Sequence, residues 1–566
     1  MNPEYKFKTK AASLLAGVSM FALSAGVSAL ETLPKDKSMS GMDIELVGRA
    51  DLWTYQSCDS YNESPLTQSY VDAGKLPPVN ERMPKEPWMA KKDQMVDGIG
   101  EYGGTFRHVI GGRPEGFNWL AGQSQGWGGI NIQLMESLTR LGPLWQVKAE
   151  EANPLPNLAK DWEFSDDRKS LTMYLLEGAR WSDGNMFDTE DIDFWWNDNV
   201  QDANVNSRLP KDALGAGTTL EILGPYSFKF NFDEPKGNAV LAQLAYMGGA
   251  PGPSHVMKSL HPSHNSDATY ESYANGMPAS VLPIVTMGAF VPVVHKVDEL
   301  MVMKRNPYYW KVDEDCNQLP YYNETIYKLT SWDDRTTQAL AGTGDFSNME
   351  NPGNYVEALK QNKDPNSPVK SVFGTRLIAW DLMLNLSSEF GVSNEYEREL
   401  RKLFRNVEFR KAMSHAMDRD TMGQSVARGP FFHPHAGGFV AGSPFHNFDD
   451  SIYYAYNVAG ANSILDGLGL EDSDGNGIRN LPNGGDDLVI DVLYNSLRST
   501  DNKLADASVS MFEAIGMKPV LKPSDNTDAF TDSGNWSMYI AREHWVVASK
   551  NIGDRLPTTS QNPQWH

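Results

Sequence analysis

Cysteine is nearly absent from this sequence, because Cys58 and Cys316 are the only two among 566 residues. A metal cluster built on several thiolates is therefore excluded by number. In an oxidising compartment the two residues could form one disulfide, whereas two free, buried thiols are the alternative. The sequence leaves both possibilities open, because it does not show that the two side chains meet.

Long apolar runs are also scarce, and beyond the N-terminus no segment is long and apolar enough to cross a bilayer. The one such run, residues 11–29, follows Lys6, Lys8 and Lys10 and ends in Val27-Ser28-Ala29. A basic start, an apolar stretch and small final residues are typical of a signal peptide. We therefore predict that residues 1–29 are a signal peptide cleaved after Ala29 and that the protein is exported to the periplasm, with a membrane anchor as the alternative.

Positive charge is deficient: 50 lysines and arginines face 73 acidic residues, which gives a net charge of −23. Removal of residues 1–29 takes away three lysines and one glutamate, so the charge becomes −25. Such a chain repels phosphate backbones, and we expect no nucleic-acid partner.

A hydrophobic content of 40% indicates a folded protein, and the length indicates more than one lobe. The 48 glycines and 33 prolines indicate many connections and a mixed α/β fold.

The most informative local pattern lies at residues 170–199. The stretch 170–181 has strand character, and Ser-Asp-Gly-Asn at 182–185 predicts a tight turn. Asp188 is then placed to cap a helix. Acidic residues in its first turn and apolar residues at helical spacing predict a buried tryptophan-bearing face, formed by Ile192, Trp195, Trp196 and Asn199. Capping accounts for these carboxylates without a catalytic role.

Three other segments raise alternatives. "GQSQG" (122–126) matches the nucleophile elbow of serine hydrolases through Ser124, although its glycine-rich flanks favour a flexible loop. The histidines match no strong metal signature, and we predict no metal site; they are His255, His261, His264, His433 and His435. Residues 472–487 begin like a calcium loop but place Asn483 where an EF-hand uses glutamate, so an ordinary turn is favoured over weak calcium binding.

Five blocks in order resemble the family 5 extracellular solute-binding proteins, which are components of bacterial ABC importers. The blocks are "PNLAKDWEFSDDRKSLTMYLLEGARWSDGNMFDTEDIDFWW" (156–196), "MKRNPYYWKVDEDCNQLPYYNETIY" (303–327), "TTQALAGTGDF" (336–346), "NVEFRKAMSHAMDRDTM" (406–422) and "FEAIGMKPVLKP" (512–523). In one departure, Cys316 stands where long members of the family commonly carry glycine, so that turn is expected to be altered. In another, the chain stops several dozen residues earlier than such proteins usually do.

The resemblance implies an α/β, two-lobed periplasmic binding protein fold with mixed sheets, surrounding helices and a ligand cleft between the lobes. The expected divisions are an N-terminal extension at 30–95, a discontinuous first lobe at 96–140 and 226–325, an inserted small domain at 141–225, and a second lobe at 326–566 that lacks the family's C-terminal end. Binding in such proteins favours a closed form, which the permease recognises.

The implied function is capture of an oligopeptide or oligosaccharide between the lobes and its delivery to an ABC permease, by a monomer without cofactor or catalysis. Similar peptide binders suggest ligand contacts by Asn385, Arg542 and Trp545, and aromatic faces add Trp119, Trp127 and Trp380. Ala548 stands where such a binder has an aspartate for the peptide ammonium, which favours a neutral ligand. The alternatives are an exported serine hydrolase using "GQSQG" and an envelope chaperone-like protein.

Overall fold

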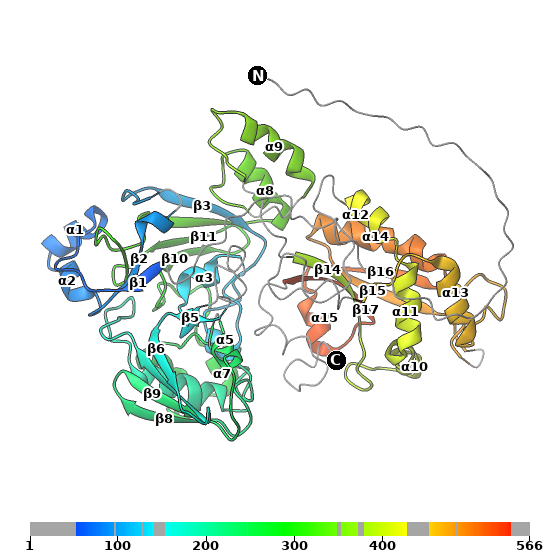
Figure 1. Ribbon diagram of the computed structural model, residues 1–566, viewed down its shortest axis with the longest axis horizontal. Coiled ribbons are helices and arrows are strands. Elements are labelled where there is room, and N and C mark those ends of the chain that lie inside the picture. The colour runs from blue at the N-terminus through cyan, green and yellow to red at the C-terminus, as the bar shows by residue number, and fades with distance from the viewer. Residues whose placement is uncertain are drawn as a thin grey trace.

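The chain folds around two separate hydrophobic cores, one on each side of the molecule in Figure 1. The computed structural model describes residues 52–95, 98–126, 128–140, 153–245, 247–347, 352–371, 378–426, 452–482 and 485–544. The first core runs from Ile110 to Trp332, and the second runs from Leu400 to Ile540. Two cores of this size make two lobes, as the sequence predicted.

The main sheet of the first lobe has the strand order β10-β11-β13-β3, in which β13 and β3 pair in parallel and the other pairs are antiparallel. Alternating side chains at residues 105–110 predict a strand there, and that strand is β3. The elements of this lobe are β3 (Thr105–Ile110), η4 (Trp119–Ala121), α3 (Ile130–Leu134), β4 (Thr139–Arg140), β5 (Leu155–Pro156), α5 (Ala239–Gln243), α6 (Ser254–Met257), η7 (Lys258–Leu260), α7 (Tyr270–Ala274), β10 (Phe290–Lys296), β11 (Leu300–Arg305) and β13 (Glu324–Leu329). The expected start of the second lobe at 326 falls inside β13.

An antiparallel sheet with the order β6-β7-β9-β8 forms the small domain below the main sheet in Figure 1. Its elements are β6 (Ala159–Phe164), β7 (Ser170–Leu175), α4 (Thr189–Asp193), the π-helix η6 (Phe194–Val200), β8 (Thr219–Gly224) and β9 (Ser227–Asn231). Asp188 caps α4 in a capping box with Asp191, and Trp195 and Trp196 are buried, as predicted. Strand β9 extends this sheet beyond the expected boundary at 225.

The N-terminal segment is attached to the first lobe through a small sheet and a disulfide. The sheet has the order β1-β2-β12, and Cys58 is bonded to Cys316 just after β12. The buried guanidinium of Arg82 is paired with Glu63 at 2.8 Å. The elements are β1 (Trp53–Tyr55), α1 (Pro65–Asp72), α2 (Val79–Arg82), β2 (Trp88–Ala90), η3 (Lys92–Gln94) and β12 (Lys311–Asp313).

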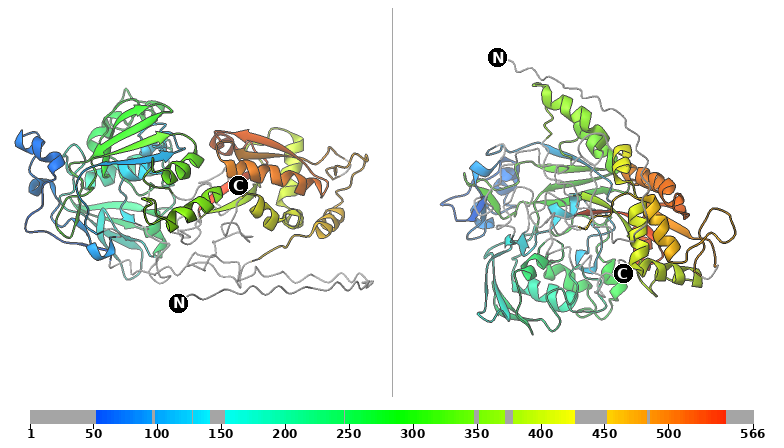
Figure 2. Two further views of the ribbon diagram at one scale, coloured as in Figure 1. Left: turned by 90° about the horizontal axis from the view of Figure 1, so that it is seen from above. Right: turned by 45° about the vertical axis from the view of Figure 1, so that its right-hand side comes forward.

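The second lobe is built on a sheet with the order β14-β17-β15-β16, in which β14 and β17 are antiparallel and the other pairs are parallel. The elements are β14 (Ile378–Leu384), α10 (Glu395–Arg405), α11 (Val407–Ala416), α12 (Arg419–Val426), α13 (Val458–Gly467), β15 (Val489–Asn495), α14 (Ser499–Glu513), β16 (Lys518–Ser524), α15 (Asp528–Ser533) and β17 (Met538–His544). Figure 2 shows these helices on the faces of the sheet.

Helix α8 (Trp332–Leu340) follows β13 directly and stays with the first lobe. The Arg335 guanidinium donates to the Val109 carbonyl of β3 at 2.9 Å, and Trp332 belongs to the first core. The 3-10 helix η8 (Pro352–Asn354) and α9 (Tyr355–Lys363) come next, before the chain reaches β14. In Figure 1 the pair α8 and α9 lies above the junction of the two lobes. Across the described ranges, no helix combines the length and apolarity of a membrane span.

Candidate functional site

Two of the predicted site residues, Trp380 and Arg542, are direct neighbours in the second lobe. They face each other in the register of β14 and β17, so both side chains leave the same face of the sheet. The Trp380 indole N–H donates to Asp501 Oδ1 at 2.9 Å. Trp380 is half-buried, so that one end is anchored while part of the ring is accessible.

Asp501 supplies a buried acidic group beside these two side chains. It lies in the first turn of α14, and its side chain is fully buried. Burial raises the pKa of Asp501, and the nearby cations Arg498 and Arg542 oppose that rise. Arg498 Nη1 is 3.6 Å from Asp501 Oδ2, which has no hydrogen-bond donor among the described residues.

The start of α8 brings first-lobe groups to the same place. The Arg542 guanidinium lies over the Trp332 ring, 5.8 Å from its centroid. On the adjacent residue, Asp333 Oδ2 accepts a hydrogen bond from the Ser499 backbone N–H at 3.1 Å. The cluster formed by Trp332, Asp333, Trp380, Ser499, Asp501 and Arg542, which we call the junction cluster, therefore joins the two lobes.

The junction cluster combines a half-buried indole, a carboxylate and a guanidinium. An aromatic face packs on apolar ring faces, and charged groups exchange hydrogen bonds with hydroxyls. Such a set suits a neutral, hydroxyl-rich ligand held between two walls.

The Asn385 side chain makes hydrogen bonds within the second lobe. Its side-chain amide donates to the carbonyls of Gly534 and Trp536 at 3.1 and 3.0 Å, and its Oδ1 accepts from the Ser387 N–H. Arg401 donates to the same two carbonyls, and Asn385 is 1% exposed. These bonds fix a turn of the second lobe, and the ligand contact expected of Asn385 stays a prediction.

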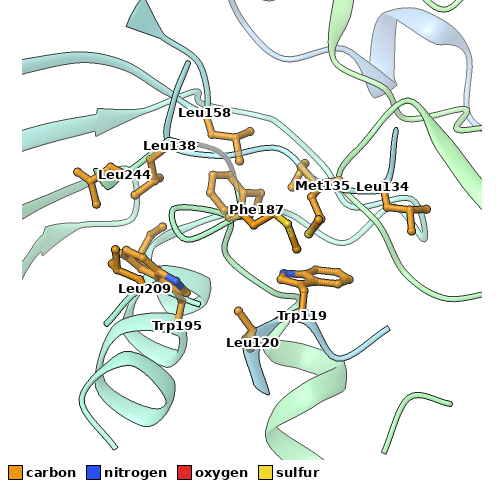
Figure 3. Close-up of a cluster of buried hydrophobic side chains, with 14 of the residues drawn as sticks. Trp119, Leu120, Leu134, Met135, Leu138, Leu158, Phe187, Trp195, Leu209 and Leu244 are labelled. Carbon is orange, nitrogen blue, oxygen red and sulfur yellow. The ribbon is translucent and has the colours of Figure 1, made fainter. Parts of the chain in front are cut away.

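Trp119 lies in the core of the first lobe (Figure 3), away from Trp380. It is 1% exposed, and its indole N–H donates to the Pro251 carbonyl at 3.2 Å. Burial and this hydrogen bond explain the position of the Trp119 side chain without a ligand. The ligand contact expected of Trp119 stays a prediction. Trp127 and Trp545 fall outside the described residues, as do Ala548, His433 and His435.

Ser124 does not lie on a nucleophile elbow. The 3-10 helix η4, and not a strand, precedes it, and the short helix α3 begins only at Ile130. Its hydroxyl oxygen accepts a weak bond from the Gly126 N–H at 3.4 Å. The strand–turn–helix context of that motif is therefore missing at this point in the chain.

The acidic segment 472–487 forms a turn that bonds to itself. Asp472 accepts hydrogen bonds from the backbone of Gly475, Asn476 and Gly477, and the Asn476 amide donates to Asp487. Asn483 lies outside the described residues. The described residues contain no group of three or more His, Cys, Asp or Glu side chains that could hold a metal ion.

The turn at Cys316, which was expected to be altered, has a backbone conformation typical of glycine and carries a disulfide. Cys316 has φ +63°, the left-handed conformation that glycine adopts most readily. The turn thus has a backbone suited to glycine, and the cysteine that occupies it is held by Cys58.

Sequence reasoning missed Trp332, Asp333, Ser499 and Asp501. The "SWDD" stretch after a strand marks a helix start, with Ser331 as the cap. No local pattern in "SWDD" or around Ser499, however, predicts that the start of α8 meets the start of α14, because Asp333 and Ser499 are 166 residues apart.

Residues 153–555 match the model of the bacterial extracellular solute-binding proteins, family 5. The chain belongs to this family of solute-binding proteins.

The chain is 43% identical over 562 residues to the periplasmic alpha-galactoside-binding protein of Rhizobium meliloti, covering 98% of this chain and 80% of that one. It is 41% identical to the periplasmic binding protein MelB of Agrobacterium fabrum in complex with stachyose, with a TM-score of 0.89, covering 95% of this chain and 82% of that one. The oligopeptide-binding protein AppA of Bacillus subtilis, solved with a nonapeptide, shares the fold at 18% identity and a TM-score of 0.63, covering 83% and 85%.

Proposed function

We propose that this protein binds an α-galactoside oligosaccharide between its lobes in the periplasm and delivers it, as a monomer, to the permease of an ABC importer. The observation that carries the proposal is the likeness, over almost the whole chain, to an alpha-galactoside-binding protein and to a binding protein in complex with stachyose. The protein itself carries out no reaction in this proposal.

Three members of the junction cluster, Trp380, Asp501 and Arg542, supply the side chains that such a ligand needs. We assign Trp380 and Arg542 to the surface of the second lobe that contacts the ligand. Asp501 lies behind them and accepts the Trp380 indole N–H. The half-buried indole packs on a sugar ring, and the guanidinium donates to hydroxyls. Trp127 and Trp545 lie outside the described residues and stay predicted ligand contacts.

An oligopeptide is the second candidate, because AppA, which shares the fold, was solved with a nonapeptide. Ala548 argues against it, since a similar peptide binder has an aspartate there for the ligand ammonium. A buried ammonium without a partner is unfavourable by several kcal/mol, of the order of the desolvation penalty of an ion.

Titration calorimetry with stachyose, a maltotetraose control of equal length and a nonapeptide tests the proposal. We expect binding of stachyose, with much weaker binding of the other two. Trp380→Ala should weaken stachyose binding at least tenfold, because truncation of a buried aromatic contact loses about 1.5 kcal/mol or more. Tight binding of the peptide would contradict the proposal. Failure of both sugars to bind would contradict it as well.

Export is tested separately by N-terminal sequencing of the protein purified from its native cell. We propose that the mature chain begins at Leu30, after cleavage behind Ala29. An intact Met1 in the membrane fraction would contradict this.

A further inference from the structure

The first turn of α8 and the first turn of α14 come together in the junction cluster, although they belong to different lobes. Helix α8 is fixed to the first lobe through Arg335, which bonds to Val109, and through Thr330, whose N–H donates to the Ile110 carbonyl. Helix α14 packs on β15, β16 and β17 of the second lobe. A bond between these two helix starts is therefore a bond between the lobes.

Helix α14 has no side-chain cap of its own. Its N-cap residue is Arg498, whose side chain makes no capping hydrogen bond. The N–H of Ser499, the first helical residue, is instead accepted by Asp333 of the first lobe at 3.1 Å. The first N–H groups of a helix lack partners within the helix, and they carry its positive end.

Asp333 also lies in the first turn of α8, after the cap residue Ser331. A single carboxylate is thus shared by the positive ends of two helices, one from each lobe. The neighbouring contact of Arg542 with Trp332 spans the same junction. Separation of the lobes would break both contacts and leave the start of α14 without its acceptor.

The lobe arrangement with this bond is similar to that of a relative solved with its ligand. The superposition on the stachyose complex of the Agrobacterium protein has a TM-score of 0.89 over 95% of the chain, so both lobes are placed alike. We propose that Asp333 and the Ser499 N–H form an inter-lobe latch that stabilises the closed form and thereby raises affinity for the ligand. The calorimetric part of this inference rests on the proposed α-galactoside function.

The latch can be removed from either side with little change to the rest of the structure. Ser499→Pro deletes the N–H at the first helical position, where proline is well accommodated, and Arg498 already has the extended backbone that precedes proline. Ser499→Ala keeps the N–H and is its matched control. Asp333→Ala removes the acceptor. Asp334→Ala is the second control, because Asp334 bonds to Thr330 within the first lobe.

Calorimetry with stachyose should show about fivefold weaker binding for Ser499→Pro and for Asp333→Ala, the size of a lost helix cap. The double variant should lose no more than either single one, because both remove the same bond. Ser499→Ala and Asp334→Ala should bind like the wild type. Unchanged binding in both latch variants, additive losses in the double variant, or an equal loss in Ser499→Ala would each overturn the latch.

Small-angle scattering of the ligand-free protein separates the latch from the ligand assignment. If the wild type binds no stachyose, the proposed function fails while the latch is still tested. A larger radius of gyration for Ser499→Pro than for Ser499→Ala would then support the latch, and equal values would overturn it.

Discussion

Cys58 is disulfide-bonded to Cys316, and Cys316 holds a left-handed backbone conformation with φ +63°. The bond fastens the N-terminal segment to the turn after β12, next to a small core that includes Val79, Met83 and Val312. One residue therefore combines a cross-link with a backbone conformation that side chains disfavour.

We expect loss of this disulfide to destabilise the fold, and the residue left at 316 to matter. Cys58→Ser should lower the free energy of unfolding by about 2–5 kcal/mol. Within that background, Cys316→Gly should be more stable than Cys316→Ser by about 1 kcal/mol, since glycine adopts positive φ without strain. Urea unfolding followed by tryptophan fluorescence measures both effects. Equal stability of the two double variants would contradict the strain argument.

The buried pair of Lys311 and Glu136 gives a second prediction. Their side chains lie 2.8 Å apart and are 5% and 10% exposed. Lys311→Met should cost about 3–5 kcal/mol, because it removes the buried cation that pairs with the Glu136 carboxylate, and Lys311→Met with Glu136→Gln should recover much of that loss.

The surface pair of Lys304 and Glu324 is the control, since Lys304 is 48% exposed. Lys304→Met should cost less than about 1 kcal/mol. A loss at Lys311 no larger than that at Lys304 would show that burial of the Lys311 pair has no energetic consequence.

His108 on β3 should make stability depend on pH. Burial, assisted by the positive charge of Arg335, lowers the pKa of His108 to about 4 from 6.5. As pH falls, the unfolded chain therefore takes up the proton first. The contribution of His108 to the free energy of unfolding is complete above about pH 6.5. It is lost as pH falls toward 4, by about 3 kcal/mol in total.

Comparison with His108→Gln isolates this effect, because glutamine does not titrate and keeps a donor for the Gly128 carbonyl. The stability of the wild type should fall more steeply between pH 6.5 and 4 than that of the variant. Parallel pH profiles would show that His108 is not responsible.

Ser124 should not behave as a nucleophile. Its hydroxyl lies in a loop after η4, without the strand that an elbow requires. A fluorophosphonate probe should leave Ser124 unlabelled, and Ser124→Ala should bind stachyose like the wild type. Stoichiometric labelling at Ser124 would restore the hydrolase alternative.

Local sequence patterns determined the elements whose cause is local. Alternation at 105–110 predicted β3, and Asp188 with its acidic first turn predicted α4 with its buried tryptophans. Trp380 and Arg542 were predicted separately as ligand contacts, and only the structure shows that they lie opposite each other on β14 and β17.

Tertiary structure alone decided how distant segments meet. The disulfide joins residues 258 positions apart, and Asp501 reaches Trp380 only because α14 packs on β17, the strand that pairs with β14. Asp333 meets Ser499 because β13 carries α8 to the edge of the first lobe, opposite the start of α14. Periodicity and capping act over a few residues, whereas these contacts depend on how sheets and lobes pack, so the sequence by itself determined the parts and their packing decided the site.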